Sequence, residues 1–253
     1  MSFSIITTVL NGEKFIADCI ESVQKQKYSK SLEHIIVDGG SSDNTISIVK
    51  KLSKEFKNII LISKQNIGIY QGINIGIDKA RNKFLAILNS DDFYISSDVF
   101  ESLELVFNNN PNISAVHSNV MIYKRNDLNK IYRIFNSKEF FPEDFLKCKH
   151  PPHTSLFIKK EIYQELGKFN EKLQIASDFE FMLRVFGKNR IKSKFIDKIF
   201  VGMRSHGTST KNLKNILISN NEVVKSFKLN NLKINYLYLI LKIFKKLTQI
   251  KIW

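Results

Sequence analysis

Short apolar segments alternate with segments of helical periodicity along the first ninety residues. Apolar residues run together at residues 3–10, 34–38, 59–63 and 84–88, and each segment predicts a strand. Residues 13–27, the stretch after Asn44 and residues 70–80 carry apolar positions at helical spacing and predict helices. Because strand and helix alternate, the pattern predicts an α/β fold with a Rossmann-like, mainly parallel central sheet flanked by helices.

The second predicted helix follows two polar residues that can begin a helix. Asp43 or Asn44 would cap it, and its buried face would consist of Ile46, Val49 and Leu52. The first predicted helix places Cys19 on its apolar face, which indicates a core residue rather than a reactive thiol.

Polar clusters follow three of the predicted strands. They are Thr8 to Asn11, Asp38 to Ser42, and Asn89 to Asp92. Ligands of parallel sheets bind beyond the carboxyl ends of the strands. The three clusters therefore predict a binding site at this edge of the sheet.

Adjacent carboxylates at Asp91 and Asp92 repel each other unless a cation or hydrogen-bond donors compensate. A divalent metal that bridges to a diphosphate would do so, and Mg²⁺ or Mn²⁺ prefers oxygen ligands. The alternative is that one aspartate caps a turn and the other is solvated. The turn at Asp38 either approaches a ligand with its glycines or is a plain turn before a helix. Neither a GxGxxG nor a Walker A sequence occurs.

Composition places the chain among globular proteins with a substantial core. It has 253 residues, of which 43% are hydrophobic and 25% are charged, and this excludes collagen, disulfide-stapled miniproteins and wholly disordered chains. Two cysteines make no disulfide framework, and no signal peptide or membrane span is predicted, so we expect a cytoplasmic protein. The formal net charge of +15 favours anionic partners.

The positive charge is concentrated at the C-terminal end, and we place a domain boundary at residue 210. Residues 1–210 carry the alternating pattern, whereas residues 211–253 contain nine lysines and one acid, Glu222. Aromatic and aliphatic residues mixed with lysines predict an amphipathic helical tail that binds a membrane surface. The alternative is a helix that packs on its own domain or on a second subunit, which would make a homo-oligomer.

Seven segments together resemble a known family. They occur in the family's order and spacing over residues 3–210, and they are Ile5–Asn11, Ile35–Thr45, Gly68–Asn74, Leu88–Asp92, His153–Phe157, Gly167–Glu171 and Ser177–Arg184. These segments resemble the family 2 glycosyltransferases, which are inverting enzymes with the GT-A fold.

The resemblance implies a role for each matched residue. Asp178 would be the catalytic base, and Asp92 would ligate a divalent metal, Mn²⁺ or Mg²⁺, on the diphosphate. The residues implied to bind the nucleotide sugar are Thr8, Leu10, Asp38, Asn74, Asp91 and His206. His153, Arg204 and Ser209 would contact the acceptor or the diphosphate. For Asp178 an alternative stays open, because Ser177 and Glu180 have the spacing of a capping box before a buried stripe of Phe179, Met182, Leu183 and Phe186.

The activity implied is transfer of a hexose or N-acetylhexosamine from a UDP-sugar. The acceptor would be a polyprenyl-diphosphate-linked saccharide in bacterial O-antigen or capsule-type synthesis, at the inner face of the cell membrane. One alternative is a sugar nucleotidyltransferase, although Asn11 to Lys14 is a poor version of its glycine-rich loop. Another is a basic nucleic-acid-binding protein, but no zinc finger or RNP-type motif occurs, so no nucleic-acid partner is expected.

Overall fold

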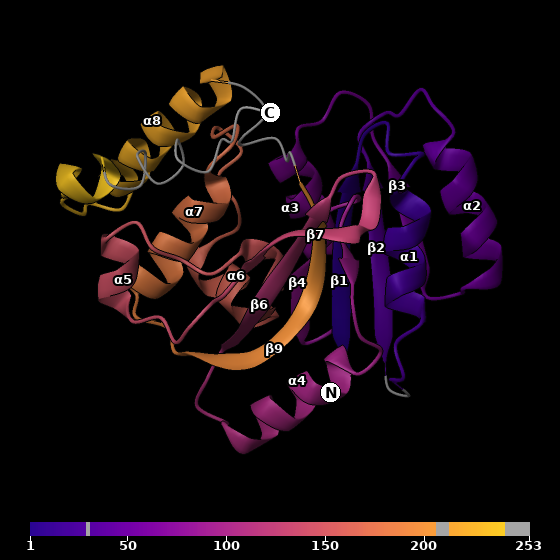
Figure 1. The fold of residues 1–253 in the computed structure, drawn as a ribbon, viewed down its shortest axis with the longest axis horizontal. Helices are drawn as coiled ribbons and strands as arrows, with labels where there is room; N and C mark the ends of the chain where they lie inside the picture. The colour runs from indigo at the N-terminus through magenta and orange to yellow at the C-terminus, as the bar shows by residue number, and fades with distance from the viewer. Residues whose placement is uncertain (29–30, 206–212, 241–253) are drawn as a thin grey trace.

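A curved mixed sheet forms the centre of the molecule (Figure 1). The computed structural model describes residues 1–28, 31–205 and 213–240. Within these residues the sheet has nine strands, in the order β3-β2-β1-β4-β8-β6-β9-β5, with β7 paired to β6. The strands are β1 (Phe3–Val9), β2 (Leu32–Asp38), β3 (Ile59–Ser63), β4 (Phe84–Ile87), β5 (Phe93–Tyr94), β6 (Ala115–Lys124), β7 (Asp127–Phe135), β8 (Leu156–Lys159) and β9 (Ser193–Arg204).

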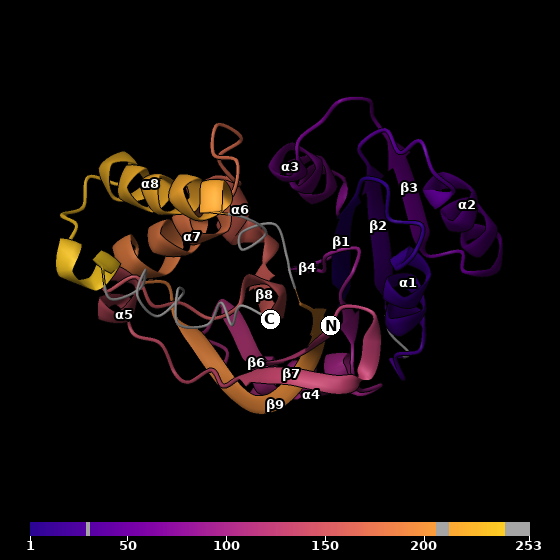
Figure 2. The same ribbon diagram turned by 45° about the horizontal axis from the view of Figure 1, so that its top comes forward.

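Helices cover both faces of this sheet, as the alternating pattern predicts (Figure 2). They are α1 (Ile16–Gln24), α2 (Thr45–Glu55), α3 (Ile69–Lys79), α4 (Val99–Asn109), α5 (Pro142–Leu146), α6 (Lys160–Leu166), α7 (Ser177–Met182) and α8 (Leu213–Leu229). A short 3₁₀ turn, η1 (His153–Ser155), precedes β8, and a π-helical turn, η2 (Leu183–Lys188), continues α7.

The first four strands are parallel, and they confirm the four predicted strands. The other half of the sheet is mixed, because β8 runs antiparallel to both β4 and β6. β6 and β7 also pair antiparallel, which a two-residue connection at Arg125 and Asn126 permits. The parallel part therefore follows from the repeated strand–helix pattern, whereas the mixed part depends on hairpin and long-range pairing.

Strand alternation divides the core between the two faces. Phe3 and Ile5 of β1 pack in a buried cluster with α1 and α4, while Ile6 of the same strand faces a cluster that contains residues of α3 and α7. Successive side chains of a strand point to opposite faces, so one strand contributes to both clusters. Cys19 is fully buried, which confirms its place in the core.

The helix α8 lies against α7 and extends the second of these clusters (Figure 1). Val223 and Phe227 are fully buried, and the ring centroids of Phe227 and Phe179 are 6.1 Å apart. Residues 213–229 of the predicted tail therefore pack on the same core as α7. None of the helices in the described ranges combines the length and the apolar character that crossing a bilayer requires.

Candidate active site

The loops that follow β1 and β2 are joined by hydrogen bonds. The backbone N–H of Asn11 donates to Ser41 Oγ over 2.8 Å, and Asn11 Oδ1 accepts from the backbone N–H of Ser42 over 2.9 Å. The backbone N–H of Gly12 donates to Thr45 Oγ1 over 2.8 Å. Two of the three polar clusters therefore lie side by side at the carboxyl edge of the sheet.

Asp38 is fully buried at the end of β2, where its carboxylate shapes the following turn. It accepts hydrogen bonds from the backbone N–H groups of Gly40, over 3.0 Å, and Ser41, over 3.2 Å. Gly40 has a φ of +98°, a conformation that favours glycine. Beside this turn, at the end of β1, Thr8 is half-buried and Leu10 is 60% exposed.

Asp92 is a buried carboxylate beside another carboxylate. Burial and then the negative charge of Asp91 raise its pKa to about 7. Asn89 donates its side-chain amide N–H to Asp92 Oδ2 over 2.8 Å. Asp91 instead faces Arg125, with 2.9 Å between Oδ2 and the guanidinium Nη1. The third polar cluster therefore holds a carboxyl group whose ionisation costs free energy unless a cation compensates.

Two arginines surround the aspartate pair. Arg204 is buried, donates to the backbone oxygen of Asp91 over 2.7 Å, and also donates to the carboxylate of Asp18. The Phe15 ring lies 4.6 Å from the Arg204 guanidinium and 5.0 Å from that of Arg125. Sequence reasoning missed Arg125, because it belongs to no motif and only the β6–β7 hairpin brings it to Asp91.

Asp178 lies in the first turn of α7, where its carboxylate is half-buried. Its Oδ1 accepts from the backbone N–H of Phe179 over 2.8 Å, and its Oδ2 lies 3.1 Å from Nδ1 of His153. Burial alone would raise the pKa of Asp178, but the hydrogen bond and charge of His153 outweigh it and lower that pKa to about 2. Asp178 is therefore a carboxylate at neutral pH.

The capping box proposed for Ser177 and Glu180 does not form. Ala176 occupies the N-cap position without a side-chain cap, and the Ser177 hydroxyl has no partner among the described residues. Glu180 instead pairs with Arg184, with 2.9 Å between their charged groups. The predicted stripe of Phe179, Met182, Leu183 and Phe186 is buried.

His153 joins the two acidic parts of the site. Burial would lower its pKa, but the hydrogen bond and charge of Asp178, together with the charge of Asp92, raise it above the ordinary histidine value. The imidazole also lowers the pKa of Asp92 against the effect of burial. Asp178 and Asp92 are therefore close enough to one imidazole for both charges to act on it.

Two residues of α3 hold the loop that leads to Asp178. Asn74 is buried, and its side-chain N–H groups donate to Phe169 O over 2.9 Å and to Glu171 Oε1 over 2.8 Å. Tyr70 donates its hydroxyl to the backbone oxygen of Ile175 over 2.7 Å. These contacts are structural, and the predicted contact of Asn74 with a nucleotide sugar stays a prediction.

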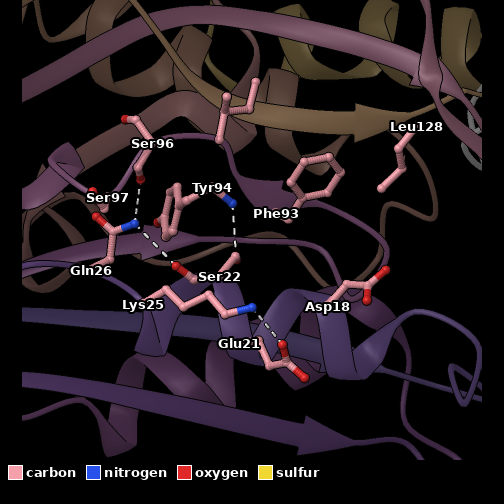
Figure 3. A pocket seen from close by; sticks show the side chains of 11 residues that line it. Asp18, Glu21, Ser22, Lys25, Gln26, Phe93, Tyr94, Ser96, Ser97 and Leu128 are labelled. Atoms are coloured by element: carbon pink, nitrogen blue, oxygen red, sulfur yellow. Dashed lines mark hydrogen bonds and ion pairs between the residues drawn. The ribbon is translucent and has the colours of Figure 1, made fainter.

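A separate open hollow of about 420 Å³ lies between α1, β5 and Leu128 (Figure 3). None of the residues predicted for the active site lines it. Asp18, on its rim, connects it to the site through Arg204. His206 and Ser209 lie outside the described residues, and within those residues no group of three or more metal-ligating side chains occurs.

Comparison with known proteins identifies the family. Residues 4–167 match the model of glycosyl transferase family 2. This match covers well over half of the chain, so the protein belongs to that family, as its motifs predict. The family assignment favours the glycosyltransferase over the nucleotidyltransferase and the nucleic-acid-binding alternatives.

Several relatives are similar over most of this chain. It is 23% identical over 207 residues to a PGL/p-HBAD biosynthesis glycosyltransferase of Mycobacterium bovis, with 81% of this chain and 77% of that protein covered. It is 29% identical over 241 residues to chondroitin synthase of Pasteurella multocida, with 93% of this chain but 24% of that protein covered.

Solved structures share the fold. The S. aureus TarS fragment 1–349 in complex with UDP-GlcNAc superposes with a TM-score of 0.73 at 17% identity, covering 98% of this chain and 72% of that one. A mannosyltransferase of Pyrobaculum calidifontis in complex with GDP-Man and Mn²⁺ gives a TM-score of 0.65 at 14% identity, with the same coverage. The fold is thus the GT-A fold.

Proposed function

We propose that this enzyme transfers a hexose or N-acetylhexosamine from a UDP-sugar to a saccharide hydroxyl with inversion. The observation that carries the proposal is the placement of His153, which hydrogen-bonds Asp178 and also responds to the charge of Asp92. This placement supports the assignment of Asp178, on the proposed acceptor side, and Asp92, on the proposed donor side, to one site. Inverting transfer needs such an arrangement, because the nucleophile and the leaving group act on opposite faces of the sugar.

The donor would bind at the carboxyl edge of β1, β2 and β4. Its proposed contacts are Thr8, Leu10, Asp38, Asn74, Asp91 and His206. The loops after β1 and β2 are fixed to each other there, which gives a nucleotide a rigid surface. Support comes from the TarS fragment, which shares the fold and was solved with UDP-GlcNAc.

The residues at Asp92 fit a divalent cation, Mn²⁺ or Mg²⁺. The Asp92 carboxylate is buried and accepts from the Asn89 amide, and burial together with the charge of Asp91 raises its pKa, so a bound cation would favour its ionised form. Such ions are commonly bound by one or two carboxylates plus substrate phosphates, so Asp92 and Asp91 would hold the ion together with the diphosphate. When bound, the ion stabilises the negative charge that develops on the leaving diphosphate. The mannosyltransferase solved with GDP-Man and Mn²⁺ supports this assignment.

Asp178 would accept the proton of the acceptor hydroxyl. The hydroxyl oxygen forms a bond to the anomeric carbon, the bond from that carbon to the diphosphate oxygen breaks with its electron pair, and the proton moves to Asp178. No covalent enzyme intermediate is needed. Because a carboxylate with a pKa of about 2 is a weak base, the proton transfers late, when the attacking oxygen has become acidic. His153 holds the carboxylate in place, and Arg204 anchors the backbone of Asp91.

The acceptor would be a saccharide carried on polyprenyl diphosphate at the inner face of the cell membrane. Of the predicted tail, residues 211–253, the part that follows α8 would contact this membrane with its lysines and apolar side chains. Tyr236, Leu237 and Ile240, near the end of the described chain, are 58%, 60% and 48% exposed. These exposed side chains support a surface that begins after α8.

A donor screen followed by one substitution tests the proposal. The protein is incubated with UDP-glucose, UDP-galactose, UDP-N-acetylglucosamine and GDP-mannose in Mn²⁺, and nucleotide release is measured with saccharide acceptors. Asp178→Asn should lower turnover by at least a thousandfold and leave UDP binding by calorimetry unchanged, because the base acts on the acceptor. Asp98→Asn, which removes a surface acid paired with Lys198, is the control. Turnover of Asp178→Asn within threefold of the wild type would reject the base assignment.

A further inference from the structure

The only acid in the basic C-terminal segment makes a buried contact with the loop that precedes Asp178. Glu222 of α8 is 5% exposed. Its Oε1 accepts from the backbone N–H of Gln174 over 2.6 Å, and its Oε2 accepts from those of Ile175 and Ala176, both over 2.8 Å. One carboxylate thus binds three consecutive amides, and no ion pair to Glu222 is found among the described residues.

These amides connect directly to the turn that carries Asp178. Ala176 is the N-cap residue of α7, and its carbonyl oxygen accepts the backbone N–H of Glu180 over 3.0 Å. Its N–H is held by Glu222 on the other side. The backbone N–H and the carbonyl oxygen of Ala176 are therefore both held, two residues before Asp178.

The loop is also held from the opposite side by α3, through the bond from the Tyr70 hydroxyl to Ile175 O. Ile175 consequently donates to one helix and accepts from another. A carboxylate that is buried without a cation is costly, and hydrogen bonds to charged groups are stronger than those between neutral groups. The three loop N–H groups supply the hydrogen bonds that this carboxylate needs, and an apolar residue at position 222 would leave all three without that acceptor.

We propose that Glu222 is a positioning residue for the catalytic base, so that α8 completes the active site although it contributes no group that touches substrate. Glu222 fixes residues 174–176, these fix the first turn of α7, and that turn sets Asp178 at hydrogen-bonding distance from His153. This inference rests on the proposed function only for the role of Asp178 as base. The contact with the loop is independent of any substrate.

Glu222→Gln tests the inference with little change of shape. The amide N–H₂ replaces one carboxylate oxygen and faces a backbone N–H, so at least one of the three bonds is lost. Val223→Ala is the matched control, because Val223 is the next residue of α8, fully buried, and its truncation removes packing but no hydrogen bond to the loop. Both variants should lower the melting temperature.

Two measurements separate positioning from stability. Hydrogen exchange followed by NMR should show the amides of residues 174–176 exchanging at least tenfold faster in Glu222→Gln than in Val223→Ala. With the fastest of the four donors in the screen, kcat of Glu222→Gln should fall at least tenfold below that of Val223→Ala, while the donor KM of both stays within twofold of the wild type. The donor binds at β1, β2 and β4, so its affinity does not depend on the loop.

Either of two results would overturn the inference: unchanged exchange at residues 174–176 in Glu222→Gln, or equal kcat values in the two variants. If the wild type turns over none of the four donors, the proposed function and the catalytic half of the inference both fail. Exchange still decides whether Glu222 holds the loop, because that measurement needs no substrate.

Discussion

His153 interacts with the two carboxyl groups, Asp178 and Asp92, that we propose for the acceptor and donor sides of the site. It lies 3.1 Å from Asp178, and its pKa is raised by Asp178 and by Asp92 against the effect of burial. The His153–Asp178 pair stabilises the folded protein because the pKa of Asp178 is lower in the folded state, about 2, than in the unfolded chain, near 4. This contribution is complete above about pH 4 and is lost as the pH falls through about 2. The pKa of His153 is raised in the folded state above its unfolded value near 6.5. The stabilisation from the pair is therefore complete below about pH 6.5 and is lost as the pH rises through the pKa of His153 in the folded protein.

His153→Asn should move the acid limb of the profile of kcat/KM against pH upward. The wild type keeps Asp178 ionised down to about pH 2 because His153 outweighs burial. Without the imidazole the burial effect dominates at Asp178, and Asp92 loses a positive charge that lowers its pKa, so both carboxyl groups take up a proton at a higher pH and activity falls earlier on acidification. Initial rates between pH 4 and pH 8 measure the shift, and coinciding acid limbs would contradict this role of His153.

Asp92 should make nucleotide binding depend on pH. Its pKa of about 7 in the free protein means that ligation of a cation must displace a proton. The affinity for UDP in the presence of Mn²⁺ should therefore be about tenfold weaker at pH 6 than at pH 8. Calorimetry at the two pH values tests this, and Asp92→Asn should remove both the pH dependence and most of the Mn²⁺-dependent affinity. If the UDP affinity of Asp92→Asn depended on pH as strongly as that of the wild type, the pH dependence would arise from a group other than Asp92.

At the level of elements, α2 begins at a polar junction that also orders the loop after β1. The sequence left open whether Asp43 or Asn44 caps the helix. In the structure Asp43 Oδ1 accepts from the backbone N–H of Thr45 over 3.0 Å, and its Oδ2 accepts from that of Glu13 over 3.1 Å. Asn44 is the N-cap residue but makes no side-chain cap bond to the helix.

Asp43→Ala should lower the free energy of unfolding by about 1 kcal/mol, which is typical of losing a helix cap. It should also weaken UDP binding, because the backbone N–H of Glu13 loses its acceptor on Asp43 and the loop that contains Leu10 is then held less tightly, although Glu13 Oε2 still accepts from Asn44. Asn44→Ala is the matched control, and we expect a smaller effect on both quantities. Urea denaturation and calorimetry measure them, and equal effects of the two substitutions would show that Asp43 is not the cap.

At the scale of the whole molecule, positive charge and core packing divide the C-terminal segment. Val223 and Phe227 of α8 belong to the core, and Leu239 is also buried. Four lysines and seven apolar residues lie beyond residue 240. A tail that contacts a membrane would then consist of the last residues, while α8 serves the active site.

Deletion of residues 241–253 should reduce binding to vesicles that contain phosphatidylglycerol by at least tenfold, because it removes Lys242, Lys245, Lys246 and Lys251. The described core is retained, so the melting temperature should change little. Sedimentation with anionic and with neutral phosphatidylcholine vesicles measures the effect. A variant with these four lysines changed to Gln separates the effect of charge from that of apolar contact. Equal sedimentation of the full-length and shortened proteins would exclude residues 241–253 as the segment that binds the membrane.

Local pattern was sufficient for the first half of the fold. The predicted strand at residues 59–63 coincides with β3, and the predicted helix at residues 70–80 differs from α3 by one residue at each end. Buried strands and amphipathic helices have different periods, so their residues indicate them without tertiary information. The antiparallel strands β6, β7 and β8 pair with partners distant along the chain, and no local period specifies such pairing.

The sequence by itself determined the element types around the parallel strands, the polar strand ends and the family motifs, including Asp92 and Asp178. Only the tertiary structure decided that His153 binds Asp178, that Arg125 binds Asp91 and that Glu222 holds the preceding loop. The physical reason is the separation along the chain of the residues that interact. Periodicity acts between neighbours along the chain, whereas hydrogen bonds and ion pairs require approach within about 3 Å, which packing alone brings about between distant residues.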